Sequence, residues 1–79
     1  MSPEEQKYYE TYLDLFIHDG WKQFVSEIED ILDNYRIEDI KDEKQLAFVK
    51  GERAALYRVR RFANGIKNAY DQMQERENA

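Results

Sequence analysis

Cysteine is absent from this 79-residue sequence, and histidine and proline occur once each. Without cysteine no disulfide can hold the fold together, and His18 alone cannot build a zinc site. No apolar run approaches the roughly 20 residues that span a bilayer. The first residues, Met-Ser-Pro-Glu-Glu, lack the basic start and apolar stretch of a signal peptide. We therefore expect no metal, no other cofactor, no membrane span and no secretion by a signal peptide.

Catalytic motifs are also missing. The sequence contains no glycine-rich phosphate loop, no nucleophile elbow and no Cys/His pair. Its many carboxylates do not suggest a di-iron site, because such sites need Glu-x-x-His and the residue three before His18 is Leu15. We expect a protein that is not an enzyme and has no catalytic residues.

The length allows one domain, residues 1–79, and predicts marginal stability. A chain this short buries only about 60% of the surface that its unfolded form exposes. Disulfides and metals are excluded as reinforcement, so oligomerisation or docking onto another protein is the remaining usual route. We expect the partner to be a protein, either a different one or further copies of this chain.

Three helices are predicted, at about 3–17, 21–35 and 42–76. The first begins with Ser2 as N-cap, Pro3 in the first turn and Glu5 placed to close a capping box. His18, Asp19 and Gly20 resemble a helix end, with the glycine available for a left-handed cap. Residues 36–41 are expected to form the turn that reverses the chain.

The fold class predicted from these elements is all-α: a short N-terminal helix, followed by a hairpin of the second helix with a long C-terminal one. Apolar residues at helical spacing predict the core of the hairpin. They are Trp21, Phe24, Ile28, Ile31, Leu32, Val49, Leu56 and Val59. Gly51, which lies inside the third predicted helix, is expected to permit close backbone contact.

The third helix is predicted to be longer than its neighbours, about 50 Å against about 22 Å for each of the others. Its heptad pattern continues through Asn64 and Gly65, although these residues could instead kink or end the helix. Unless the first helix turns back, the stripe near the C-terminus has nothing to pack against. We therefore expect a partner interface that joins this stripe with the N-terminal tyrosines. The candidate residues are Tyr8, Tyr9, Tyr12, Phe62, Ile66, Tyr70 and Met73.

Charge is distributed unevenly along the chain. Residues 1–45 carry a net charge of −8 and residues 46–79 a net charge of +3, which gives −5 in total. The acidic balance opposes nucleic-acid binding in general. Arg53, Arg60 and Lys67, seven residues apart, could still form a binding stripe. We favour ion pairing of this stripe with carboxylates of the second helix. These are Glu27, Glu29, Asp30 and Asp33.

Two short motifs carry a resemblance to a known group of proteins. They are Gly20-Trp21-Lys22-x-Phe24 and Leu46-x-x-x-Lys50-Gly51-Glu52-x-x-x-Leu56. Over residues 20 to about 62 the sequence resembles small, mostly uncharacterised helical accessory proteins of tailed bacteriophages. The resemblance implies a virion or assembly component that docks on capsid, portal or tail subunits, located in the virion or the host cytoplasm. The alternative is a small acidic inhibitor of a host protein that handles nucleic acid.

Overall fold

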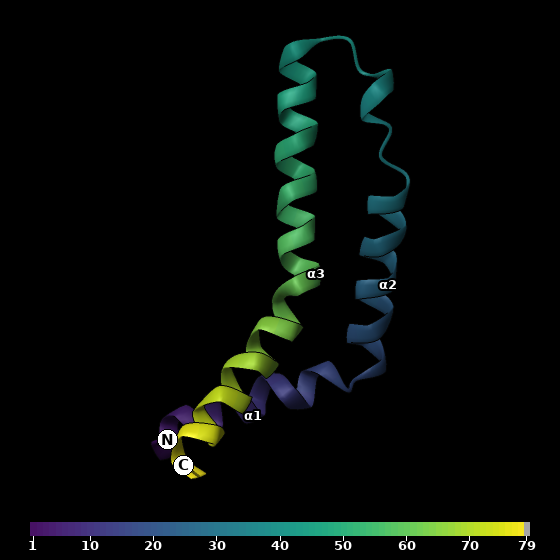
Figure 1. The fold of residues 1–79 in the computed structure, drawn as a ribbon. Helices are drawn as coiled ribbons and strands as arrows, with labels where there is room; N and C mark the ends of the chain where they lie inside the picture. Colours follow the sequence, from purple (N-terminus) through teal and green to yellow (C-terminus); the bar gives the residue numbers. More distant parts are fainter. Residues whose placement is uncertain (79) are drawn as a thin grey trace.

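The computed structural model describes residues 1–78 and contains three α-helices and one short 3-10 turn. They are α1 (Pro3–Phe16), α2 (Asp19–Asp33), the turn η1 (Ile37–Asp39) and α3 (Glu43–Asn78). The described residues include no strand, so the all-α prediction is confirmed. As Figure 1 shows, α2 runs antiparallel beside the first half of α3, and α1 crosses the second half.

The start of α1 forms the predicted capping box. The Glu5 backbone N–H donates to Ser2 Oγ at 3.1 Å, and the Ser2 N–H donates to Glu5 Oε1 at 3.4 Å. Pro3 occupies the first turn, where its missing N–H costs no intrahelical hydrogen bond. Glu4 and Glu5 also place negative charge against the positive end of the helix dipole.

The junction between α1 and α2 is tighter than predicted. α1 ends at Phe16, Ile17 is its C-cap, and His18 in extended conformation is already the N-cap of α2. Gly20 therefore lies in the first turn of α2, and no residue among 1–78 has a positive φ. The predicted left-handed glycine cap is wrong, because the chain changes direction between α1 and α2 at Ile17 and His18 with no residue of positive φ.

α3 is one helix of 36 residues that continues through Asn64 and Gly65. Its axis changes direction in the light-green part of Figure 1, in the sixties of the numbering, so the helix is bent but not ended there. A Cβ added at Gly65 would meet no atom within 4 Å. The same is true at Gly51, so the close backbone contact predicted at Gly51 does not occur within the chain.

α1 turns back and covers the second arm of α3, which places an aromatic cluster at the centre of the molecule. Phe16, only 5% exposed, lies with its ring centroid 5.3 Å from Trp21 and 6.1 Å from Phe62. Tyr12 lies 5.1 Å from Phe62 in an edge-to-face arrangement. The C-terminal stripe of α3 therefore does have cover within the chain, and the length mismatch no longer argues for a partner at that place.

The hairpin core is narrower than predicted. Ile28 and Leu32 are buried, whereas Trp21, Val49, Leu56 and Val59 are half-buried. Phe24 and Ile31 were predicted in the core but are 44% and 48% exposed. The reason is that Val25 and Leu32, each one position later, face α3 in their place.

The molecule is extended for its size. Its radius of gyration is 17.1 Å, where a compact chain of this length would have about 12 Å. Only three side chains, Phe16, Ile28 and Leu32, are buried among the described residues. The accessible surface of 6442 Å² exceeds the roughly 5,100 Å² expected for a compact 9.6 kDa protein. The chain therefore keeps more of its surface exposed than a compact monomer of its mass would.

Replacement of Ile28 tests this small core against a matched control. Ile28→Ala leaves a cavity between α2 and α3 and should lower the free energy of unfolding by about 2–5 kcal/mol. Ile17→Ala, at a position that is 72% exposed, should change it by less than about 0.5 kcal/mol. Urea unfolding followed by circular dichroism measures both values. Equal losses in the two variants would contradict the assigned core.

Candidate functional site

The two sides of the α2–α3 hairpin have different chemistry. Two antiparallel helices are related by a local two-fold axis that passes through their contact. On both helices, the residue immediately before each core residue therefore lies on one side of the hairpin. The residue immediately after each core residue lies on the opposite side. This geometry gathers two sets of side chains, one apolar and one charged.

Five of the residues that directly precede core positions are apolar and form an apolar flank. It consists of Phe24 and Ile31 on α2 and Phe48, Ala55 and Phe62 on α3. Phe48 is 70% exposed and Phe62 is 37% exposed, and Ala55 between them is also open to solvent. An apolar run of this length on a small soluble protein is typical of an interaction surface.

A hollow of about 360 Å³ opens on the apolar flank. Its walls are Trp21, Ala55, Arg58, Val59 and Phe62, so α2 contributes the indole and α3 contributes the rest. Arg58 provides the only charge at its edge. The hollow is therefore a mostly apolar depression that is open to solvent and lies next to the exposed Phe62 ring.

Lys22, Arg60 and Lys67, which directly follow Trp21, Val59 and Ile66, form a charged flank together with the neighbouring Arg61. Lys22, Arg60, Arg61 and Lys67 line an open groove of about 550 Å³, with Glu29 as its one carboxylate. The groove contains four cationic side chains against one anionic side chain. The groove is therefore locally basic on a chain whose net charge is −5.

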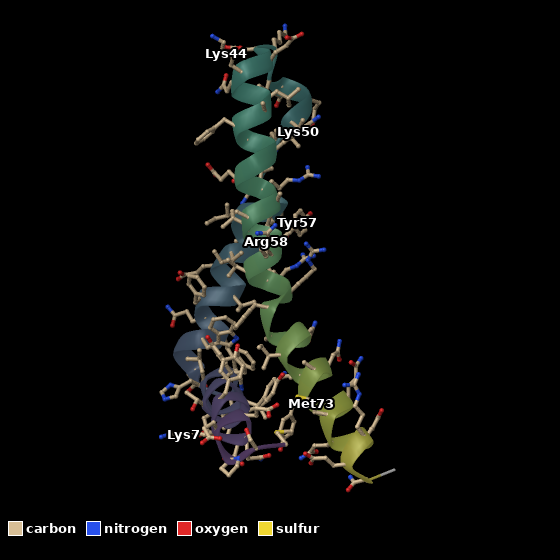
Figure 2. The ribbon with its side chains drawn as sticks, turned by 90° about the vertical axis from the view of Figure 1, so that its left-hand side faces the viewer. Lys7, Lys44, Lys50, Tyr57, Arg58 and Met73 are labelled. Atoms are coloured by element: carbon tan, nitrogen blue, oxygen red, sulfur yellow. The ribbon has the colours of Figure 1, made fainter. Side chains whose placement is uncertain are left out.

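The ion pairs predicted for the basic stripe do not form. Among residues 1–78 the only ion pair joins the Met1 amine to Glu77. Instead, the Arg60 and Arg53 guanidinium carbons lie 4.6 Å and 5.7 Å from the centroid of the Tyr57 ring. Tyr57 and its neighbour Arg58 are seen midway along α3 in Figure 2. The two guanidinium groups therefore lie over the face of an aromatic ring, which attracts their positive charge without a carboxylate.

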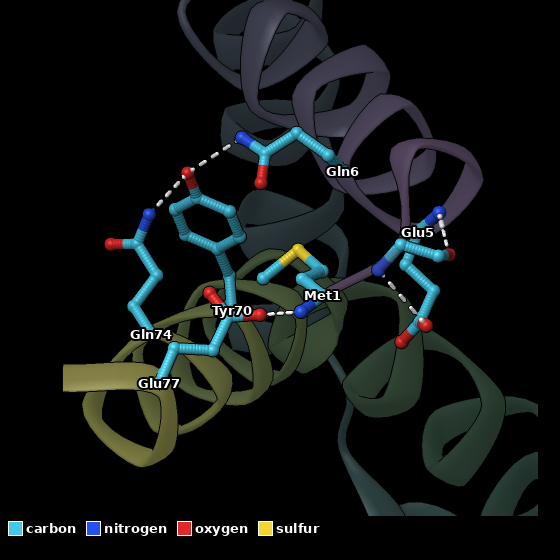
Figure 3. A network of polar contacts seen from close by, with 7 residues as sticks. Met1, Glu5, Gln6, Tyr70, Gln74 and Glu77 are labelled. Atoms are coloured by element: carbon cyan, nitrogen blue, oxygen red, sulfur yellow. Dashed lines mark hydrogen bonds and ion pairs between the residues drawn. The ribbon is translucent and has the colours of Figure 1, made fainter. Parts of the chain in front are cut away.

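Most of the predicted partner interface is used inside the chain. The Tyr9 ring lies 5.7 Å from Tyr70, and Tyr70 Oη accepts hydrogen bonds from Gln6 Nε2 at 3.1 Å and Gln74 Nε2 at 2.7 Å (Figure 3). The other members of the predicted interface divide into two groups. Tyr12, Ile66 and Met73 are half-buried, whereas Phe62 and Tyr8 are exposed.

Of the apolar flank, the sequence predicted only Phe62 as an interface residue and placed Phe24 and Ile31 in the core, although one signal pointed to the whole row. Phe48, Ala55 and Phe62 repeat every seven residues beside the heptad core, so they widen the stripe without being needed for it. A stripe wider than one neighbour can cover indicates a second contact surface. Which side of α3 would be covered depends on the docking of α2, and that docking is not visible in the pattern.

Replacing Tyr70 tests the contact between α1 and α3. Tyr70→Phe removes the acceptor shared by Gln6 and Gln74 and should lower the free energy of unfolding by about 0.5–1.5 kcal/mol. Tyr8→Phe, at a ring that is 51% exposed, should change it little. Urea unfolding of both variants gives the comparison. A Tyr70→Phe protein as stable as the parent would show that the hydrogen bond from Gln6 to Tyr70 does not hold α1 against α3.

A second polar contact ties the loop end of α2 to α3. The Tyr35 hydroxyl donates a hydrogen bond to Glu52 Oε1. This bond, together with slight desolvation and the negative charge of the carboxylate, raises the pKa of Tyr35 above its ordinary value of 10.0. The bond requires the protonated hydroxyl, so its contribution to stability is full below pH 10 and is lost as pH rises through the raised pKa.

Paired titrations test this pH dependence. The difference in unfolding free energy between the parent and Tyr35→Phe should stay constant up to about pH 9 and shrink above about pH 10. Urea unfolding at each pH measures the difference, and the other five tyrosines cancel because both proteins contain them. If the difference in unfolding free energy does not vary with pH, the hydrogen bond of the Tyr35 hydroxyl does not contribute to stability.

The described residues offer little for other chemistry. No group of three or more His, Asp or Glu side chains among residues 1–78 could hold a metal ion. None of the helices in the same range is long and apolar enough to cross a membrane. The apolar flank is therefore the feature that most clearly calls for a functional explanation.

No family model, no curated protein and no solved structure matches this chain. The resemblance to phage accessory proteins thus stays a prediction from two short motifs. The candidate site rests on the geometry of the hairpin alone.

Proposed function

We propose that the protein is a non-enzymatic helical docking protein that binds another protein surface through its apolar flank. The observation that carries this proposal is the exposure of Phe48, Phe24 and Phe62 along one side of a single hairpin. Aromatic side chains supply a large contact area at little conformational cost, and they are enriched where protein interfaces are fully buried. Scattered apolar residues would need no such explanation, but an aligned row does.

The monomer itself supports a role completed by a partner. Residues 1–78 bury only three side chains and have an extended shape, so the chain can gain stability by covering the flank. The narrower role, a virion or assembly component of a tailed phage that docks on capsid, portal or tail subunits, comes from the sequence resemblance. It fits a small docking protein that acts in many copies.

A second candidate is the small acidic inhibitor of a host protein that handles nucleic acid. It is favoured by the carboxylates on the outer side of α2, which are exposed and form no ion pair within residues 1–78. Such a complex would be steered by charge and would weaken steeply with added salt. Docking through the apolar flank should depend on salt only weakly.

Site-specific photo-crosslinking distinguishes the apolar flank from other surfaces. A benzophenone side chain placed at position 48 should give discrete protein adducts on irradiation in cells that make the protein. The matched control is position 17, where Ile17 is 72% exposed, against 70% for Phe48, but lies away from the flank. Adducts that are equal at the two positions, or absent at position 48, would overturn the proposal.

The same irradiation at raised salt separates the two candidates. Adducts at position 48 that persist support docking through apolar contact. The acidic inhibitor would be favoured if the adducts at position 48 disappear at raised salt and if a benzophenone side chain placed on the outer side of α2 gives adducts instead.

A further inference from the structure

We infer that the charged flank is a second docking surface, and that its groove binds an acidic peptide segment of a partner protein. This surface lies on the opposite side of the hairpin from the apolar flank. The inference therefore goes beyond the proposed function and does not depend on it. It is carried by the unpaired charges of the groove, by its apolar lining and by the aromatic rings beside two of its cations.

The groove gathers like charges from two helices. Lys22 belongs to α2, whereas Arg60, Arg61 and Lys67 belong to α3. Like charges gathered in one groove repel one another, although the chain contains 17 acidic side chains that could separate them. Only Glu29 lines the groove, and none of the four cations forms an ion pair within residues 1–78. The groove therefore keeps an excess of positive charge that a bound anionic segment would neutralise.

Apolar side chains line much of the rest of the groove. They come from the corner where α1 and α2 join beside α3 (Figure 1), and they are Phe16, Trp21, Val25 and Ala63. The volume of about 550 Å³ lies within the range of about 300–1,000 Å³ that holds a ligand of many atoms. A single carboxylate or phosphate would leave most of it empty. The groove therefore suits a segment that combines acidic with apolar side chains.

Aromatic rings lie beside two of the cations. The Lys67 ammonium nitrogen lies 5.9 Å from the centroid of the Phe16 ring, and the Arg60 guanidinium carbon lies 4.6 Å from that of Tyr57. A cation held by a ring keeps its charge and its hydrogen-bond donors. A side chain that is already held also loses less conformational entropy when it binds. The two cations can therefore bind a carboxylate without first leaving an ion pair.

An acidic peptide fits this groove better than a nucleic acid does. Single strands bind through phosphate contacts together with bases stacked on open aromatic rings. Here Phe16 is 5% exposed, Trp21 is half-buried, and Tyr57 already lies beside two guanidinium groups. Residues 1–45, which include α1 and α2, carry a net charge of −8 and would repel phosphates that extend beyond the groove. A short peptide segment stays within the groove and avoids this repulsion.

The first experiment titrates the parent protein with a short synthetic peptide of glutamates around a central phenylalanine, using isothermal titration calorimetry. The peptide should bind, and its affinity should fall with added salt because the groove is open to solvent. The same peptide with glutamine in place of glutamate should bind more weakly, as should an oligothymidylate of equal charge. The inference is overturned if the glutamate peptide does not bind, or if either competitor binds as tightly.

Paired substitutions place the binding in the groove. Lys22→Gln combined with Arg61→Gln removes two exposed cations and should weaken peptide binding about tenfold, with helicity unchanged by circular dichroism. Lys7→Gln combined with Lys44→Gln removes the same charge from exposed positions outside the groove (Figure 2). This control should change the affinity less than about twofold. Equal losses in the two double variants would mean that only net charge acts, and would overturn the inference.

Replacing the one carboxylate of the groove should have the opposite effect. Glu29→Gln removes the negative charge nearest to the bound peptide and should tighten binding about threefold. Glu27→Gln makes the same change in net charge at an exposed position of α2 outside the groove, and should leave the affinity nearly unchanged. A Glu29→Gln protein that binds no more tightly than Glu27→Gln would contradict the assigned groove.

Phe48→Gln separates the groove from the apolar flank. This change leaves the net charge as it is and alters an exposed ring on the opposite side of the hairpin, so the variant should bind the peptide as the parent does. Loss of peptide binding in Phe48→Gln would place the peptide on the apolar flank. That outcome would overturn the inference and leave the docking function proposed for the apolar flank standing.

Discussion

The structure depends on one constraint, which is that a single long helix must be covered along its whole apolar stripe by two helices less than half its length. α3 has 36 residues, whereas α1 and α2 have 14 and 15. Neither short helix could cover the stripe alone. Placed end to end with only Ile17 and His18 between them, they cover one arm of α3 each. The buried Phe16 ring stands at the junction, where it contacts both the second helix and the third.

Much of this arrangement follows from periodicity and end signals in the sequence. The capping box at Ser2 and Glu5, the continuous heptad through Gly65 and the reversal near residues 36–41 are local features, and local chemistry decides them. Gly20 was misread because a glycine after an apolar run suits a helix end equally well as a first turn. The backbone conformations of Ile17 and His18 decide between the two, and neither residue type signals its conformation.

The candidate surface was harder to predict, because it depends on how two helices dock. Phe24 and Val25 are neighbours in the sequence and both belong to the apolar stripe of α2, yet only Val25 faces α3. A rotation of α2 by one residue would exchange their roles. In the same way, Arg60 and Glu29 line one groove without forming an ion pair, since the Tyr57 ring holds the arginine instead. Periodicity identifies the stripe, and packing decides which edge of it stays open.

The separation of the two covering helices has a consequence for how the chain folds. The hairpin of α2 and α3 is closed by a short connection around η1, so its first contacts, such as that between Tyr35 and Glu52, join residues only 17 positions apart. The contact of α1 with the far arm joins Gln6 to Tyr70, which are 64 positions apart. Closing the longer loop costs more chain entropy, and contacts of large sequence separation form late. The hairpin should therefore assemble first, and α1 should close onto it as the last step of folding.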